Sequence, residues 1–233
     1  MSLLVAKLIS FREELAIEIQ RFLLLWKYQH HTPPFTLWWR LVLKRGVDFV
    51  CALIGTLAVS PVVAAIALAI KLESRGPVIY SQDRVGRFGE VFKIFKFRSM
   101  RIDAEAHGPV WAGGDEDPRL TRVGKFLRRT HLDELPQLIN VLRGEMSLVG
   151  PRPERPHFVE QLDREIPRYD ERLLIKPGMT DLAQVHYRYD QTIADVKRKL
   201  RFDLLYVKRM CLMLDFRILA WTFLVVVTGR GIR

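Results

Sequence analysis

The sequence predicts a mixed α/β fold that is mainly helical. Apolar side chains recur at helical spacing in several segments of its 233 residues, whereas two short runs rich in β-branched and aromatic residues favour strands. Hydrophobic residues make up 49 % of the chain although 27 % are charged, and the mean hydropathy is +0.04. These features are compatible only if apolar and charged residues occupy different segments. We therefore expect a membrane-associated part and a polar domain.

The first part, residues 1–43, is expected to lie on a membrane surface. Apolar and charged side chains alternate at helical spacing up to residue 29, which predicts an amphipathic helix. No long uncharged stretch precedes a small-residue cleavage site, so this is not the pattern of a signal peptide. Phe35, Trp38 and Trp39 follow beside Arg40, a composition typical of membrane interfaces. A helix packed against protein is the alternative.

The second part, residues 44–75, contains the longest uncharged run, from Phe49 to Ile70. This run is long enough to cross a bilayer. However, Ser60-Pro61 lies near its middle, where proline removes a backbone hydrogen bond, and basic residues flank both ends. We therefore expect a re-entrant membrane helix that is broken at Ser60-Pro61 and that enters and leaves on the same side. A spanning helix kinked at Pro61 is the alternative.

The third part, residues 76–233, has the composition of a polar domain. Residues 77–80 and 91–95 are strand-like, and the segment between them is rich in turn residues. Three cations, among them Lys96, follow the second strand. They indicate either part of an anion site or a solvated strand end.

The strongest candidate for a functional site lies between residues 121 and 156. Four apolar residues at helical spacing predict a helix that ends near Gly144, and they are Leu135, Leu138, Ile139 and Leu142. Asp133 and Glu134 precede this helix, where backbone N–H groups and the helix dipole attract anions. Arginines, including Arg128 and Arg152, lie on both sides. Two carboxylates among arginines suggest phosphate chemistry with a divalent metal, and a surface salt-bridge network is the alternative.

The remaining elements are mostly helical. We expect a charged helix from Phe158 to Arg172 that is broken at Pro167, and a short strand over Leu182–Val185. A helix is expected from Val196 to Lys208. The apolar stretch Leu212–Val227 contains two charged residues, and its uncharged part is too short to span a bilayer. A buried or membrane-surface helix fits this stretch better.

Charge and cysteine content exclude some classes of protein. The net charge of +11 fits an anionic membrane surface, anionic substrates or nucleic acid. No nucleic acid is expected as a partner, because no zinc-finger, RNA-recognition or basic-zipper signature occurs. The two cysteines, Cys51 and Cys211, lie in apolar segments without metal-ligand spacing, which favours a reducing compartment.

The segment DPRLTRVGKFLRRTHLDELPQLINVLRGEMSLVGPRP resembles the bacterial sugar transferase family, the monotopic polyprenyl-phosphate phosphoglycosyl transferases. The likeness extends from Lys44 to the C-terminus. It implies a re-entrant helix in the bacterial inner membrane with a small catalytic domain on the cytoplasmic face. It also implies transfer of a sugar 1-phosphate from a UDP-sugar to polyprenyl phosphate, with release of UMP, as the first step of glycan assembly.

The resemblance also implies roles for individual residues. Asp133 is expected to be the nucleophile that carries the phosphosugar, with Glu134 as its partner at a Mg²⁺ ion that both carboxylates bind. The substrate-binding residues implied are Lys96, Arg128, Arg152 and, in a DxxY pattern, Asp203. Asp181 stands where the family usually has glycine, so that motif is left out of the expected site.

Two other functions remain open at this point. Asp115-x-Asp117 has the form of a metal-binding motif of nucleotide-sugar glycosyltransferases, although Asp-Pro is also a common turn opening. The release of UDP instead of UMP would identify such an enzyme. A basic membrane-surface scaffold without catalysis is the third interpretation. The sequence leaves open which sugar is transferred and whether the protein forms a homodimer.

Overall fold

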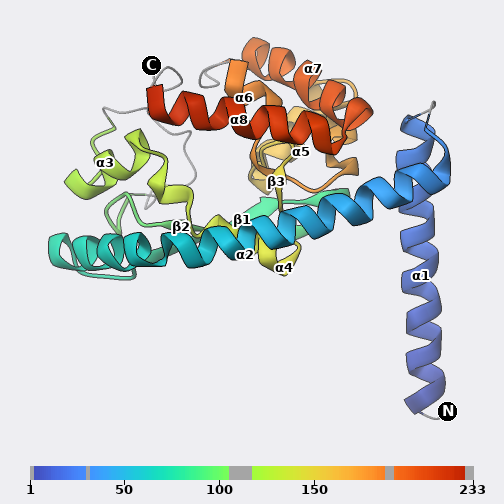
Figure 1. Ribbon diagram of the computed structural model, residues 1–233, viewed down its shortest axis with the longest axis horizontal. Coiled ribbons are helices and arrows are strands. Elements are labelled where there is room, and N and C mark those ends of the chain that lie inside the picture. Colours follow the sequence, from blue (N-terminus) through green and yellow to red (C-terminus); the bar gives the residue numbers. More distant parts are fainter. Residues whose placement is uncertain (1–2, 30–31, 105–116, 187–191, 229–233) are drawn as a thin grey trace.

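The computed structural model describes residues 3–29, 32–104, 117–186 and 192–228, and it confirms the mixed, mainly helical class (Figure 1). The helices are α1 (Leu3–Tyr28), α2 (Pro34–Glu73), α3 (Arg122–Arg129), α4 (Gln137–Arg143), α5 (Pro156–Glu165), α6 (Leu182–His186), α7 (Ile193–Arg209) and α8 (Leu212–Thr228). The strands are β1 (Ile79–Val85), β2 (Val91–Phe97), β3 (Ser147–Val149) and β4 (Gly178–Thr180). Short 3₁₀ turns lie at Arg87–Gly89, Leu132–Glu134 and Tyr169–Leu174.

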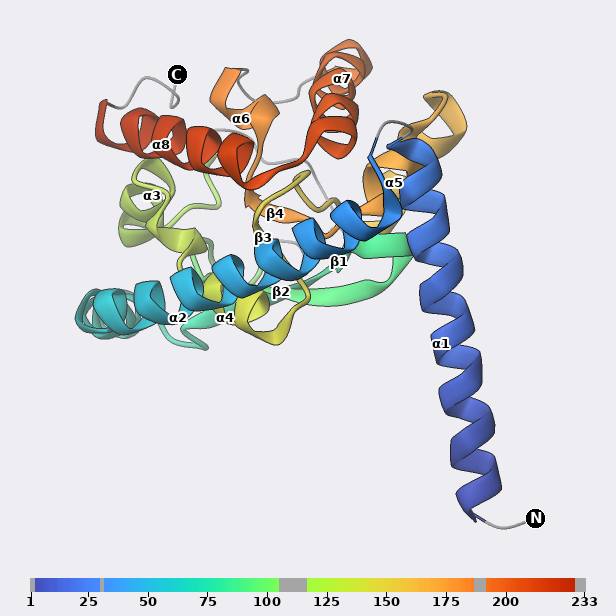
Figure 2. The same ribbon diagram turned by 45° about the vertical axis from the view of Figure 1, so that its right-hand side comes forward.

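Helix α2 runs along the length of the polar domain, and α1 projects from one end of it (Figures 1 and 2). One face of α2 enters three separate hydrophobic clusters, through Leu37, Ala52 and the pair Ile66 and Ile70. Its other face is apolar and exposed. It is the one helix in the described part of the chain that is long and apolar enough to cross a membrane. The expected boundary between residues 43 and 44 falls inside this helix.

The helix does not end at Ser60-Pro61, where we expected a break. Proline 61 has no N–H to donate to the carbonyl of Leu57, four residues earlier. The hydroxyl of Ser60 donates to that carbonyl instead, at 2.8 Å. The helix therefore continues through the proline because a neighbouring side chain satisfies the freed acceptor.

Two small sheets organise the polar domain. Strands β1 and β2 pair antiparallel over their full length, which confirms the two strand-like runs and places Tyr80 opposite Lys96. Strands β3 and β4 pair in parallel. Their backbones come very close together, since a Cβ added to Gly178 would lie 2.1 Å from the nitrogen of Gly150. Glycine is needed there for lack of space, so the loop after β3 lies directly against β4.

The expected strand over Leu182–Val185 is wrong, because these residues form helix α6 and the strand lies just before them. The carboxylate of Asp181 accepts a hydrogen bond from the backbone N–H of Gln184 at 2.6 Å. That is the contact of a helix N-cap, and it starts α6 immediately after β4. The predicted helices over Val196–Lys208 and Leu212–Val227 are confirmed as α7 and α8.

Buried polar residues attach α2 to the rest of the domain. Asp48, which is buried, accepts hydrogen bonds from the Ser147 hydroxyl at 2.7 Å and from the backbone N–H of Leu148 at 3.2 Å. Lys44 forms an ion pair with Asp215 of α8 at 2.8 Å. These contacts hold α2, β3 and α8 together, and β3 leads directly into the segment that carries Arg152.

Candidate active site

Asp133 and Glu134 lie in a 3₁₀ turn that precedes α4, so the two carboxylates come before the helix as expected. The turn begins after His131, whose φ of 56° is in the left-handed region. Helix α4 then begins at Gln137 and ends at Gly144, which adopts φ 84° and confirms the predicted helix end.

Glu134 is held between two cations that come from different parts of the chain. Lys96 on β2 donates to Glu134 Oε1 at 2.8 Å, and Arg152 donates to both carboxylate oxygens. Burial would raise the pKa of Glu134, but the charges of Arg152 and Lys96 outweigh it and keep the pKa well below its ordinary value. Glu134 is therefore ionised, and it fixes the position of both cations.

Asp133 is in a different state from its neighbour. Its side chain is buried with 7 % exposure, yet within the described part of the chain its carboxylate has no hydrogen-bond or ion-pair partner. Burial raises the pKa of Asp133, while the charge of Lys96 lowers it. A buried, unpartnered carboxylate beside a cationic cluster is suited to attack an electrophilic phosphorus or to bind a metal.

Asn140 connects α4, the helix that follows these carboxylates, to β2, the strand that carries Lys96. Its side chain is completely buried, its amide donates to the Lys93 carbonyl at 2.7 Å, and its oxygen accepts from the Phe95 N–H at 3.0 Å. It thus bridges α4 to β2 just before Lys96. Our reading of the sequence missed Asn140, although an amide within an otherwise apolar helical run is the signal that could have identified it.

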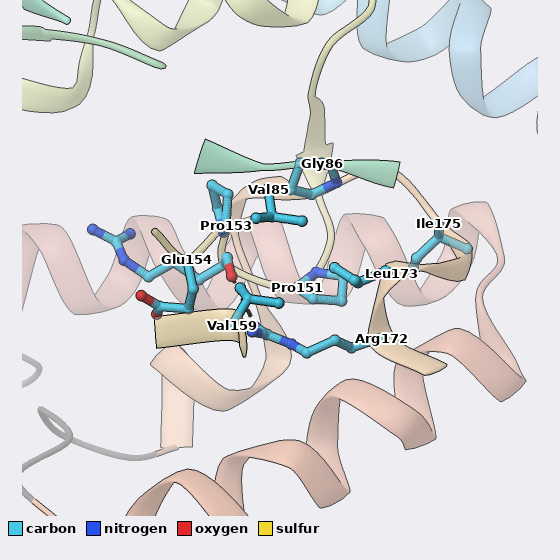
Figure 3. A pocket seen from close by; sticks show the side chains of 11 residues that line it. Val85, Gly86, Pro151, Pro153, Glu154, Val159, Arg172, Leu173 and Ile175 are labelled. Carbon is cyan, nitrogen blue, oxygen red and sulfur yellow. Dashed lines mark hydrogen bonds between the residues drawn. The ribbon is translucent and has the colours of Figure 1, made fainter. Parts of the chain in front are cut away.

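The segment that carries Arg152 is held by its backbone at almost every residue. Gly150 N–H donates to Thr180 O at 3.0 Å, Pro151 O accepts from Gly178 N–H at 3.0 Å, and Pro153 O accepts from Arg84 at 2.9 Å. Only about 10 Å³ of free volume remains behind this segment, room for about one water (Figure 3). The Arg152 side chain itself keeps 36 % exposure, so it can reach a ligand.

Arg172 supports Arg152 from behind and was also missed. Its guanidinium donates to the backbone carbonyl of Arg152 at 2.8 Å and to the Asp203 carboxylate at 2.9 Å. Figure 3 shows the side chain passing beneath Pro151. Burial raises the pKa of Asp203 to about 7, against the lowering effect of Arg172. Asp203 is therefore paired with the residue that holds the Arg152 segment, and the substrate-binding role that the resemblance implies for it stays a prediction.

The other predicted residues are placed as follows. Arg128 is half-buried at the end of α3, its charge lowers the pKa of Asp133, and it has no ion-pair partner among the described residues. Asp117 pairs with Arg119, with both carboxylate oxygens engaged at 2.8 and 2.6 Å. Asp115, the other half of the glycosyltransferase motif, lies outside the described residues. The charge of Glu134 is the main cause that raises the pKa of Arg152, and the buried Asp181 adds to it.

The expected Mg²⁺ fits this donor set. Across residues 3–29, 32–104, 117–186 and 192–228, no group of three or more acidic, histidine or cysteine side chains is arranged to hold a metal alone. Proteins commonly hold Mg²⁺ through one or two carboxylates, with substrate phosphates and waters as the other ligands. Asp133 offers both of its oxygens for this role, and Glu134 could join once Lys96 or Arg152 leaves it.

Comparison with known proteins identifies related chains. A UDP-N-acetylgalactosamine-undecaprenyl-phosphate N-acetylgalactosaminephosphotransferase from Aeromonas hydrophila is 47 % identical over 82 % of this chain and 45 % of its own length. A relative from Bacillus subtilis (strain 168), described as a putative undecaprenyl-phosphate N-acetylgalactosaminyl 1-phosphate transferase, is 54 % identical over 57 % of this chain and 74 % of its own. A UDP-glucose:undecaprenyl-phosphate glucose-1-phosphate transferase from Escherichia coli (strain K12) is 45 % identical over 78 % of this chain and 39 % of its own length.

The chain thus spans less than half the length of two of these relatives. The family model described as bacterial sugar transferase matches residues 39–229, which is most of the chain. The protein therefore belongs to the bacterial sugar transferase family.

Proposed function

We propose that this protein transfers a sugar 1-phosphate from a UDP-sugar to polyprenyl phosphate, releases UMP and so starts the assembly of a glycan. The observation that carries the proposal is the contrast between two adjacent carboxylates. Glu134 is neutralised by Lys96 and Arg152, whereas the buried Asp133 has no partner in the part of the chain that the structure describes. The names of the relatives, which are undecaprenyl-phosphate sugar phosphotransferases, support the same reaction class.

The first step is attack by a carboxylate oxygen of Asp133 on the sugar-bearing phosphorus of the donor. A new O–P bond forms, the bond from that phosphorus to the bridging oxygen breaks, and UMP leaves with the electron pair. Arg128 and Arg152, which are both partly exposed, would bind the diphosphate oxygens and reduce repulsion between the carboxylate and the anion. Lys96 forms an ion pair with Glu134, and its charge also acts on Asp133.

In the second step an oxygen of the lipid phosphate attacks the same phosphorus and displaces Asp133. The product is a polyprenyl diphosphate sugar, and the enzyme is restored. Splitting the transfer in two means that the site never has to bind two anionic substrates at once. A bound Mg²⁺ would stabilise negative charge on the phosphate oxygens, with Asp133 and Glu134 as the protein ligands.

The acceptor is a membrane lipid, so the site must lie at a bilayer surface. We propose that α2 lies along the cytoplasmic face of the bacterial inner membrane, with its exposed apolar face in the bilayer and both of its ends on the cytoplasmic side. The exposed face of α2 supports membrane insertion, since Ile54, Leu57 and Leu68 are each at least 60 % exposed. Cysteines placed at Arg40 and Arg75, both exposed, in a background without Cys51 and Cys211, should react only with reagents on the cytoplasmic side. Labelling of either one from the periplasm would contradict this topology.

The leaving group separates this reaction from glycosyl transfer. Incubation with polyprenyl phosphate, Mg²⁺ and a panel of UDP-sugars should release UMP with at least one donor. Release of UDP would identify a glycosyltransferase instead and would favour a role for Asp115-x-Asp117. No nucleotide release with any donor, together with no thermal stabilisation by UDP-sugars, would favour a scaffold.

A further inference from the structure

A groove with a volume of about 460 Å³ lies among α6, α7 and α8, helices that gather on one side of the molecule (Figures 1 and 2). Six apolar side chains line it: Leu182 from α6, Phe202 and Leu205 from α7, and Leu214, Ile218 and Trp221 from α8. Its volume is in the range of pockets that bind small organic ligands, about 300–1,000 Å³. Trp221 and Leu205 remain 44 % and 39 % exposed, so the groove is open to a ligand.

Two cations complete the lining of this apolar groove. Arg209 is the last residue of α7 and Arg217 lies on α8, and both side chains are exposed. Neither has an ion-pair or hydrogen-bond partner among the residues that the structure describes. An apolar groove lined also by two unpaired arginines is complementary to a molecule with an apolar chain and an anionic head.

The groove is distinct from the site around Asp133. None of the residues that line the groove belongs to the cluster of Lys96, Asp133, Glu134 and Arg152. The groove therefore has its own apolar lining and its own pair of cations. Helix α8, which lines the groove, is joined to α2 by the Lys44–Asp215 ion pair.

We propose that this groove binds one anionic membrane phospholipid, with an acyl chain against Phe202, Ile218 and Trp221 and the phosphate at Arg209 and Arg217. The bound lipid would help to dock the domain onto an anionic bilayer. Basic residues next to an apolar surface commonly recognise anionic lipids. The inference requires only that the protein is bound to a membrane and does not depend on the transfer reaction.

The test uses the full chain in phosphatidylcholine nanodiscs that contain increasing amounts of phosphatidylglycerol with brominated acyl chains, which quench nearby tryptophan fluorescence. A bound lipid should give a quenching component that saturates at a low fraction of phosphatidylglycerol and that is lost in Trp221→Phe. The double variant Arg209→Gln/Arg217→Gln should need about 30-fold more phosphatidylglycerol, about fivefold for each arginine.

The matched control is Arg198→Gln/Arg201→Gln, which removes the same charge from exposed positions on α7 that do not line the groove. This variant should saturate at the same lipid fraction as the parent. Equal quenching by brominated phosphatidylcholine, or an unchanged saturation point in Arg209→Gln/Arg217→Gln, would overturn the proposal. Displacement of the brominated lipid by polyprenyl phosphate in preference to phosphatidylglycerol would also overturn it, because the groove would then belong to the acceptor.

Discussion

Replacement of Asn140 by alanine tests whether the bridge between α4 and β2 positions the two carboxylates. The change removes the hydrogen bonds to the Lys93 carbonyl at 2.7 Å and from the Phe95 N–H at 3.0 Å. Two backbone groups then lose their partners, at a cost of about 1–3 kcal/mol each. We expect the free energy of unfolding to fall by about 2–6 kcal/mol, which corresponds to roughly 4–24 °C in melting temperature for a chain of this size.

The assay for Asn140→Ala has two parts. Thermal unfolding in detergent, followed by near-ultraviolet circular dichroism, measures the stability loss. The rate of UMP release is measured at a temperature where the variant is still folded. This rate should also fall, because it depends on the position of Asp133 and Glu134 relative to Lys96. Gln161→Ala, which removes an exposed hydrogen bond to Glu165, is the control and should cost less than about 0.5 kcal/mol. If Asn140→Ala has the same melting temperature as this control and keeps parental activity, the bridge does not position the carboxylates.

Three further predictions concern the packing of α3 and the chemistry of the site. Gly124→Ala should lower the melting temperature, because its Cβ would lie 1.8 Å from the carbonyl oxygen of Ser99; an unchanged melting temperature would contradict this packing. Arg152→Lys keeps the charge but loses the planar fork that binds two oxygens, so kcat/KM should fall by about tenfold or more, and near-parental activity would indicate a simple counter-charge. Only ionised Asp133 attacks, so activity falls as the pH falls through its pKa; burial raises that pKa and the charge of Lys96 lowers it. The acid limb of a kcat/KM profile should therefore move to higher pH in Lys96→Gln, and a shift to lower pH would refute the assignment.

Local signals in the sequence were sufficient for most helices. The spacing of apolar residues identified α7 and α8, and Gly144 identified the end of α4. Local contacts also explain two differences. The Asp181 carboxylate starts α6 where a strand was expected, and the Ser60 hydroxyl satisfies the carbonyl that Pro61 leaves free. Both are side-chain to backbone hydrogen bonds, to which apolar periodicity is insensitive.

The sequence was sufficient to predict which residues form the candidate site, but not which of them contact each other. Asp133, Glu134 and the neighbouring arginines stand out because they lie within one short segment. The Glu134 contact with Lys96 joins residues 38 positions apart, and no spacing rule relates them. Arg172 gave no signal at all, since its partners become neighbours only when the chain folds.

The most direct test of the central claim is the intact mass of the protein after incubation with a UDP-sugar and Mg²⁺ in the absence of any lipid acceptor. The covalent mechanism predicts release of up to one UMP per enzyme and a mass increase equal to one sugar phosphate. Asp133→Asn should show neither the release nor the adduct, and its circular dichroism should match that of the parent. Direct attack by the lipid, with Asp133 only as a metal ligand, predicts no adduct and no UMP until polyprenyl phosphate is added, and that result would contradict the account.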